Sequence, residues 1–259
     1  MTALSAAPPA PHRSLSRLHR AALLVWAAFV LLVAGWLLWL HLSEVPAERT
    51  CQSFFAYSPM GGHPRTCDYS AFTDANNLFN VLGEVLSYSC VAVAAWAGGA
   101  LVGRELESGT AKLAWTQSVS PARWLAGKLT AAAVPLAAGG GLAALVFGWV
   151  WSSDRKWLVS NWTYDRVFIP RGPLLPALLL LGLAVGALAG IALRRALPAL
   201  GTAAAATLLT RLYLREAWKP LRGPLHGFWA VHLSATAMVL ALAAAAAAGA
   251  FCILRHQAR

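Results

Sequence analysis

Charge is scarce in this sequence, and acidic charge is the scarcest kind. Asp, Glu, Lys and Arg make up 12% of the 259 residues, with 10 acidic residues against 21 Lys and Arg. A soluble domain usually carries about a quarter charged residues. The apolar residues, 58% of the chain, stand in long blocks rather than at the spacing of a water-soluble core. We therefore expect a protein whose solvent is the lipid bilayer.

The signatures of several enzyme classes are also missing. The chain has no G-x-x-x-x-G-K-[ST] phosphate-binding loop, no H-E-x-x-H zinc motif and no G-x-S-x-G nucleophile motif. Its 7 histidines are dispersed, and only His232 falls well inside an apolar block. We expect no catalytic residue, no metal site and no cofactor bound by this chain.

The net charge of +11 does not indicate a nucleic-acid partner. A nucleic-acid-binding domain gathers its basic residues on one soluble face. Here Lys and Arg are scattered at the ends of the apolar blocks, where they meet lipid headgroups and set the orientation of a membrane protein. The bilayer is the expected partner.

Six apolar blocks are long enough to cross a bilayer, and each should be a helix because backbone polar groups in lipid must be satisfied within the segment. The first block is longer than a signal-peptide core of about 7–15 residues and runs into "WLLWLHL", a poor cleavage site. We interpret it as a retained helix. The predicted spans are residues 21–40, 82–102, 129–151, 174–193, 197–214 and 228–254, which form one domain (21–254) between tails of residues 1–20 and 255–259.

Six spans put both tails on the same side of the membrane. Arg13, Arg17 and Arg20 directly precede the first span and place that side in the cytoplasm. With this orientation 11 Lys and Arg residues lie inside and 10 outside, so the assignment depends on the first helix.

The one sizeable external segment is then the loop of residues 41–81. It contains Cys51 and Cys67, whereas Cys90 and Cys252 lie inside predicted spans. Two cysteines in one exported loop favour a disulfide, which would contribute about 3 kcal/mol by closing a loop of that size. A metal site is the less favoured alternative, because only His63 lies between the two cysteines.

Two further features of the spans each allow two interpretations. Gly182, Gly186 and Gly190 repeat every fourth position, a pattern that lets another helix approach closely. That helix belongs either to this chain, which we favour, or to a second copy. Glu84, at the outer end of the second span, is either a carboxylate near headgroups, the favoured interpretation, or the ion-binding group of an ion-coupled transporter.

A dense polar segment separates the second and third spans. Residues 103–128 read "GRELESGTAKLAWTQSVSPARWLAGK". Gly109 is expected to end the second helix, a short helix follows, and Ser120-Pro121 fits a helix N-cap and first turn. Leu113 and Trp115 would be presented as apolar contacts, with Thr116, Gln117 and Ser118 as hydrogen-bonding groups. The segment is either a protein docking surface or an interfacial loop with Trp115 and Trp124 anchored among headgroups.

This polar segment resembles the one that follows the second helix in ABC-2 type transporter permeases of actinobacteria. "GALAGIALRRALPAL" is similar to the family's step from the fourth to the fifth span, and "FWAVHLSATAMVLALAAA" more weakly to the opening of the last. The chain departs from the family at Pro121, where many relatives have a basic residue. It also has a short loop between the last two spans, "REAWKPLRGPLHG", which could form a re-entrant turn around Pro220 and Pro224. The residues of the polar segment that match are Glu105, Glu107, Gly109, Thr110, Leu113, Ala114, Trp115, Thr116, Gln117, Ser118, Val119, Ser120, Arg123, Trp124, Leu125, Lys128 and Leu129.

The resemblance implies an all-α bundle of six transmembrane helices, like that of a type V exporter, with a cytoplasmic coupling helix between helices two and three. It implies a bacterial cell-membrane exporter in which two permease copies, or this chain and a related permease, pair with ABC ATPase subunits that carry ATP and Mg²⁺. The few polar groups in the spans fit a hydrophobic or amphipathic cargo. The residues implied in contact with the ATPase are Glu105, Glu107, Gly109, Thr110, Leu113, Trp115, Thr116, Gln117, Ser118 and Arg123.

Two other classes of function stay open on the residues alone. One is a membrane-anchored sensor or assembly protein that recognises something outside through a disulfide-closed loop. The other is an ion-coupled transporter that relies on Glu84. Neither requires an ATPase subunit, which the permease interpretation does.

Overall fold

A computed structural model describes residues 20–44, 69–116, 119–155, 158, 161–221 and 227–257, and within these ranges it contains helices and no strand. Six helices are long and apolar enough to cross a membrane, which confirms the predicted all-α bundle. Cys51, Cys67, Gln117, Ser118 and Pro224 lie outside the described residues.

The helices follow one another in a simple order. The first span is α2 (Arg20–Trp39), which continues as the π-helical turn η1 (Leu40–Glu44). The second combines α4 (Tyr69–Trp96), the π-helical η2 (Ala97–Gly103) and the short α5 (Arg104–Glu107). The remaining elements are α6 (Thr110–Thr116), α7 (Pro121–Ser153), α8 (Asp165–Phe168), α9 (Leu174–Leu193), α10 (Ala196–Trp218) and α11 (Phe228–Gln257).

The second span begins earlier than the sequence predicts. The loop was expected to reach residue 81, but α4 starts at Tyr69. The helical part of this stretch is polar on one side, so a search for continuous apolar runs misses it. Its other side buries Ala75 and Phe79, which are 2% and 0% exposed, and the Phe79 ring stacks 4.5 Å from that of Phe147 on α7. The early start is therefore an amphipathic extension held by tertiary packing.

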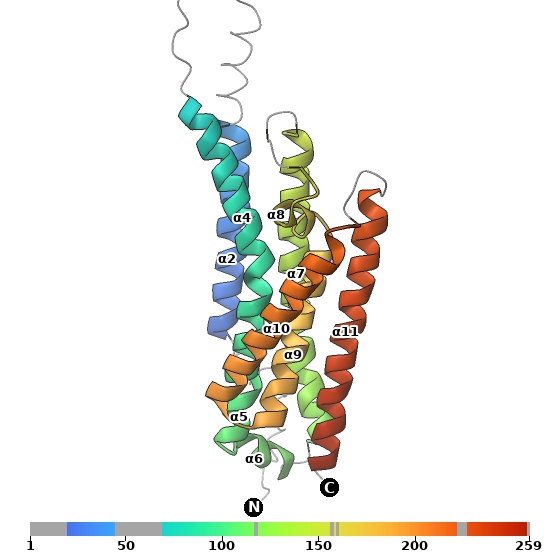
Figure 1. Ribbon diagram of the computed structural model, residues 1–259. Helices are drawn as coiled ribbons and strands as arrows, with labels where there is room; N and C mark the ends of the chain where they lie inside the picture. Colours follow the sequence, from blue (N-terminus) through green and yellow to red (C-terminus); the bar gives the residue numbers. More distant parts are fainter. Residues whose placement is uncertain are drawn as a thin grey trace, which may run out of the picture.

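Successive long helices run in opposite directions, so α2 begins and α11 ends toward the same end of the bundle (Figure 1). That end also carries α5 and α6. At the opposite end the chain turns back alongside α7 after Ser153, and α8 packs against α4. The polar segment therefore lies at the end that holds the two described termini.

α9 is the central helix of the bundle. Of its 20 residues, 13 are buried, and it contacts α4, α7, α10 and α11. Its glycines allow this closeness, because a Cβ on Gly186 would lie 2.5 Å from the Ala94 carbonyl oxygen and 2.6 Å from the Ala97 Cβ. A Cβ on Gly190 would lie 2.9 Å from the Val102 Cβ. The glycine face thus packs on α4 and η2 of the same chain.

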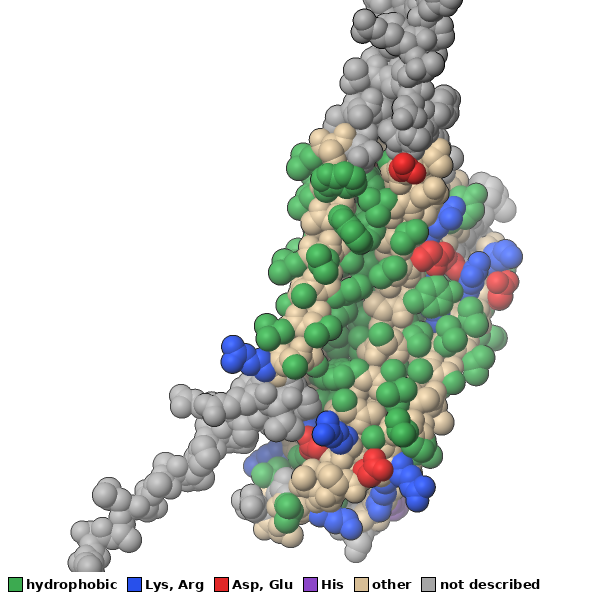
Figure 2. Space-filling view, turned by 90° about the vertical axis from the view of Figure 1, so that its left-hand side faces the viewer, with side chains coloured by type: hydrophobic (Ala, Val, Ile, Leu, Met, Phe, Trp, Pro, Cys, Tyr) green, Lys and Arg blue, Asp and Glu red, His purple; other side chains and the backbone are tan. Residues whose placement is uncertain are grey.

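Large apolar side chains cover the outside of the bundle. Figure 2 shows apolar surface between one group of charged side chains at the lower end and another at the upper right. Such a surface suits contact with lipid tails. The most exposed of these residues include Leu197 (80%), Leu145 (74%), Val25 (70%) and Tyr213 (69%).

The packing of α9 predicts an effect of a single methyl group. Gly186→Ala should lower the thermal stability of the purified chain, because overpacking of a close contact costs about 1–3 kcal/mol. Gly201→Ala is the matched control, since a Cβ on Gly201 of α10 meets nothing within 4 Å. Equal melting temperatures of the two variants, followed by fluorescence-detected size exclusion, would contradict the close α9–α4 contact.

Candidate functional site

The polar segment is a compact helix–turn–helix at the end of the second span. Gly109 has a φ of 74°, the left-handed conformation that glycine adopts most readily, and it stands between α5 and α6. The Thr110 hydroxyl lies 3.0 Å from the Ser108 hydroxyl and donates to the Glu105 carbonyl at 3.3 Å. The expected helix stop at Gly109 is confirmed, and these hydroxyl contacts hold the turn together.

The start of α7 also matches the expectation. Ser120 is extended, with φ −62° and ψ 144°, and its hydroxyl accepts a hydrogen bond from the Arg123 amide at 3.3 Å. Pro121 occupies the first turn, where its missing N–H leaves no hydrogen bond unmade. The departure from the family pattern at Pro121 therefore leaves a regular helix N-terminus.

Glu105 ties the polar segment to α7 through an ion pair. Its carboxylate accepts a hydrogen bond from the Lys128 ammonium at 2.5 Å, and Lys128 also donates to the Leu101 carbonyl at 3.1 Å. Lys128 is only 2% exposed and Glu105 17%. A charge this buried is stable only with a partner in good geometry. Lys128 belongs to the matched motif, but the residue pattern alone did not indicate that it pairs with Glu105.

Glu107 makes a second connection, a solvent-exposed hydrogen bond to α10. Its carboxylate accepts a hydrogen bond at 2.9 Å from the backbone amide of Ala196, which is the first residue of α10. Carboxylates are favourable at helix N-termini because they accept a hydrogen bond from an unpaired N–H and because their negative charge lies at the positive end of the helix dipole. Arg195, the residue before α10, makes no side-chain cap of its own. The acidic pair therefore joins the polar segment to two different membrane helices.

The two apolar residues of α6 differ in exposure. Both were expected to be presented outward, but Trp115 is partly buried, with its ring edge-on to that of Trp124 on α7 at 5.8 Å. Leu113 is 64% exposed. Trp115 therefore anchors α6 to the bundle, and Leu113 is the large apolar side chain that α6 presents. Thr110, Thr116 and Arg123 are also exposed.

The part of the second span that directly precedes the polar segment, η2, is π-helical. The turns of η2 contain Gly98, Gly99 and Gly103, and a Cβ on Gly98 would lie 2.7 Å from the Ala199 carbonyl oxygen of α10. π-Helical turns in otherwise α-helical spans often mark functional positions. Here the wide turns bring η2 against both α9 and α10 just before the polar segment begins.

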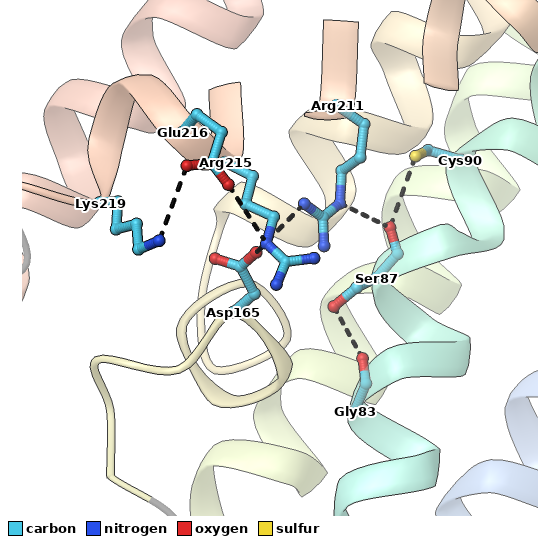
Figure 3. Close-up of polar contacts among 8 residues, drawn as sticks. All are labelled: Gly83, Ser87, Cys90, Asp165, Arg211, Arg215, Glu216 and Lys219. Atoms are coloured by element: carbon cyan, nitrogen blue, oxygen red, sulfur yellow. Dashed lines mark hydrogen bonds and ion pairs between the residues drawn. The ribbon is translucent and has the colours of Figure 1, made fainter. Parts of the chain in front are cut away.

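A second polar cluster lies inside the bundle near α8. Arg211 of α10 is 2% exposed and faces Asp165 of α8, whose carboxylate also pairs with Arg215 at 3.0 Å (Figure 3). A sequence signal existed for Arg211, a charged residue within a predicted span, but none for Asp165, which follows a loop. The spans therefore contain a buried charged side chain, Arg211, that the sequence analysis did not single out.

The histidine inside the last span has a structural partner. The His232 ring accepts a hydrogen bond from the Leu174 amide at 3.3 Å, which satisfies one of the free N–H groups at the start of α9. It stacks on Phe228 with ring centroids 4.8 Å apart. His232 is thus a capping and packing residue. Among the described residues, no three His, Cys, Asp or Glu side chains gather as metal ligands would.

Comparison with known proteins identifies a family. The family described as ABC-2 membrane transporter related matches residues 21–219, which is 199 of the 259 residues and includes the polar segment, α9 and α10. No curated protein and no solved structure matches the chain. Six apolar helices with this match make it a multi-pass membrane protein and a transport permease. The chain belongs to the ABC-2 membrane transporter related family.

Proposed function

We propose that this chain is the membrane subunit of an ATP-driven exporter and that a separate ABC ATPase subunit docks on its polar segment. The observation that carries the proposal is the pair of links from one short segment to α7 and α10, through Glu105 and Glu107. The ATP and Mg²⁺ would be bound by the ATPase, and the cargo would be a hydrophobic or amphipathic compound.

The exposed face of α6 supports a docking role. Leu113 is a large exposed apolar side chain among polar neighbours, and its helix is held from beneath by Trp115. A few side chains enclosed at the centre of an interface supply most of its binding energy, and Leu113 would be one of them if a pocket of the partner encloses it. Gly109, Thr110, Thr116 and Arg123 complete the proposed contact face, together with Gln117 and Ser118 outside the described residues.

The contacts of Glu105 and Glu107 provide a route by which a movement of α6 would reach the membrane helices. Displacement of the polar segment would move α7 through the Glu105–Lys128 ion pair and α10 through the Glu107–Ala196 hydrogen bond. Both contacts are short, and Lys128 is buried. The π-helical η2 lies between the polar segment and the rest of the second span. ATP binding can drive transport only if it favours one arrangement of these helices over another.

The proposed assembly has two permeases and two ATPases in a bacterial cell membrane. Both termini and the polar segment would face the cytoplasm, where ATP is available. The second permease would be another copy of this chain or a related permease. The exposed apolar side chains of α10, which include Leu197, Leu200 and Leu209, offer it a surface.

The docking surface predicts a selective loss of the ATPase. Leu113→Asp should reduce the ATPase recovered with the tagged chain from native membranes by about tenfold, as expected for a central interface anchor. Leu221→Asp is the control, because Leu221 is 38% exposed at the opposite end of the bundle. A chain that purifies without any nucleotide-binding partner would instead favour the sensor or anchor class.

The Glu105–Lys128 pair predicts a loss of coupling that can be separated from a loss of stability. Lys128→Met should destabilise the chain by about 3–5 kcal/mol if it leaves the Glu105 charge without its partner. The double variant Glu105→Gln/Lys128→Met should recover much of that stability, since no buried charge remains.

The double variant should still assemble with the ATPase but transport less cargo for each ATP hydrolysed. Transport and hydrolysis are measured together in proteoliposomes. Trp115→Ala removes the contact with Trp124, and Gly109→Ala strains the left-handed turn before α6, so both are expected to show the same uncoupling. A double variant with the wild-type ratio of transport to hydrolysis would rule out the ion pair as a link in coupling.

A further inference from the structure

Arg211 of α10 is a buried charge inside the helix bundle. Its Nε donates to the Ser87 carbonyl of α4 at 3.4 Å, and its guanidinium carbon lies 4.9 Å from the centre of the Tyr88 ring. Figure 3 shows the side chain reaching from α10 toward α4 and Asp165. An ionised side chain inside a membrane bundle is costly and usually has a functional reason.

The hydrogen-bond partners of Arg211 do not satisfy all the donors of its guanidinium group. Its Nη1 lies 3.6 Å from the Asp165 Oδ2, longer than a hydrogen bond, and the same oxygen is 3.0 Å from the Arg215 Nε. Within the described part of the chain, both Nη atoms of Arg211 are buried without a hydrogen-bond partner. One carboxylate thus faces two guanidinium groups. Glu216 lies 4.0 Å from the Arg215 Nε and 3.7 Å from the Lys219 Nζ, so these three cationic and two acidic side chains keep one net positive charge.

Arg211 is one of the residues that line a small cavity of about 30 Å³. That volume holds about two water molecules or an anionic group of similar size. Asp165 and Arg215 also line the cavity, and the Arg215 side chain is 49% exposed. The rest of the lining is apolar, with Leu174 and Leu178 from α9, Leu214 and Trp218 from α10, and Ala235 and Val239 from α11.

We propose that this cavity binds the anionic head of an amphipathic molecule, a phosphate or a carboxylate, whose apolar chain lies against α9, α10 and α11. A guanidinium with free Nη groups matches the two oxygens of such a head and would regain the hydrogen bonds that the protein does not supply. The apolar walls disfavour a free hydrated ion and favour a molecule that carries its own apolar chain. Binding belongs to this chain alone, so it does not depend on the proposed ATPase.

The test measures binding to the purified full chain in nanodiscs of phosphatidylcholine, without ATPase. Oleyl phosphate is the probe, and oleyl alcohol, which has the same chain and no charge, is its control. We expect oleyl phosphate to bind at least about tenfold more tightly, the value of one or two charge-assisted hydrogen bonds. Inorganic phosphate should not compete. Equal affinity for the two oleyl compounds, or full competition by inorganic phosphate, would overturn the proposal.

Variants locate the site. Arg211→Gln should weaken oleyl phosphate binding by at least about tenfold and leave oleyl alcohol unchanged. Lys219→Gln removes the cation of the residue that follows α10, which is 75% exposed, and binding should stay within about twofold of wild type. Ala235→Val keeps every charge and fills the cavity, so it tests the site even if Arg211→Gln folds poorly. Wild-type affinity in Ala235→Val and in a folded Arg211→Gln would refute the assignment.

A second arm distinguishes the two sources of such a head. Nanodiscs that contain phosphatidylglycerol should reduce oleyl phosphate binding if a bilayer lipid headgroup occupies the cavity. In that case native mass spectrometry should find the lipid on the wild-type chain and not on Arg211→Gln. Binding that phosphatidylglycerol leaves unchanged identifies a single-chain amphiphile, the kind of molecule that the exporter would carry.

Discussion

The bundle depends on how closely α9 approaches its neighbours. α4, α7, α10 and α11 all pack on this helix, and α2 joins the bundle by packing on α7. Lipid tails are as apolar as leucine, so helices in a membrane associate through close packing rather than through exclusion of water. The glycines of α9 and of η2 make this packing possible because their backbones meet where a Cβ would not fit. Small side chains at these positions therefore organise the whole bundle.

Close packing also determines which charges the bundle can hold. Lys128 and Arg211 are both 2% exposed, and each reaches across to another helix for a carbonyl oxygen and a carboxylate. Lys128 obtains a short bond to Glu105, whereas Arg211 shares Asp165 with a second arginine. The first arrangement is a complete pair that links two elements. The second is incomplete, which is why it is interpreted as a place for a ligand.

The polar segment and the Arg211 site lie toward opposite ends of α10. α10 begins at the hydrogen bond between Ala196 and Glu107, and it carries Arg211 about four turns further along. In the proposed exporter, a movement of the polar segment would therefore reach the Arg211 site along one continuous helix. The close contact of α10 with η2 and α9 would make such a movement a shift of several helices together.

The sequence predicted the elements whose signals are local. Six long apolar runs predicted six helices, Gly109 predicted the stop before α6, and Ser120 with Pro121 predicted the start of α7. The quoted motif of the polar segment indicated the family that the match over residues 21–219 then showed. Such signals are read within a few residues of the chain, because helix propensity, capping and hydropathy act over that distance.

Tertiary structure decided the contacts between residues that are distant in the sequence. The amphipathic start of α4 is stabilised as a helix by the packing of Phe79 on Phe147. Trp115 is partly buried because its ring packs edge-on against Trp124 of α7. Asp165 meets Arg211 only because the chain folds back after α7. The sequence by itself therefore determined the six spanning helices and the polar segment between the second and third. Their pairing, and the partner of each buried charge, followed from three-dimensional packing, since no residue pattern specifies which distant side chain will satisfy a charge in a medium without water.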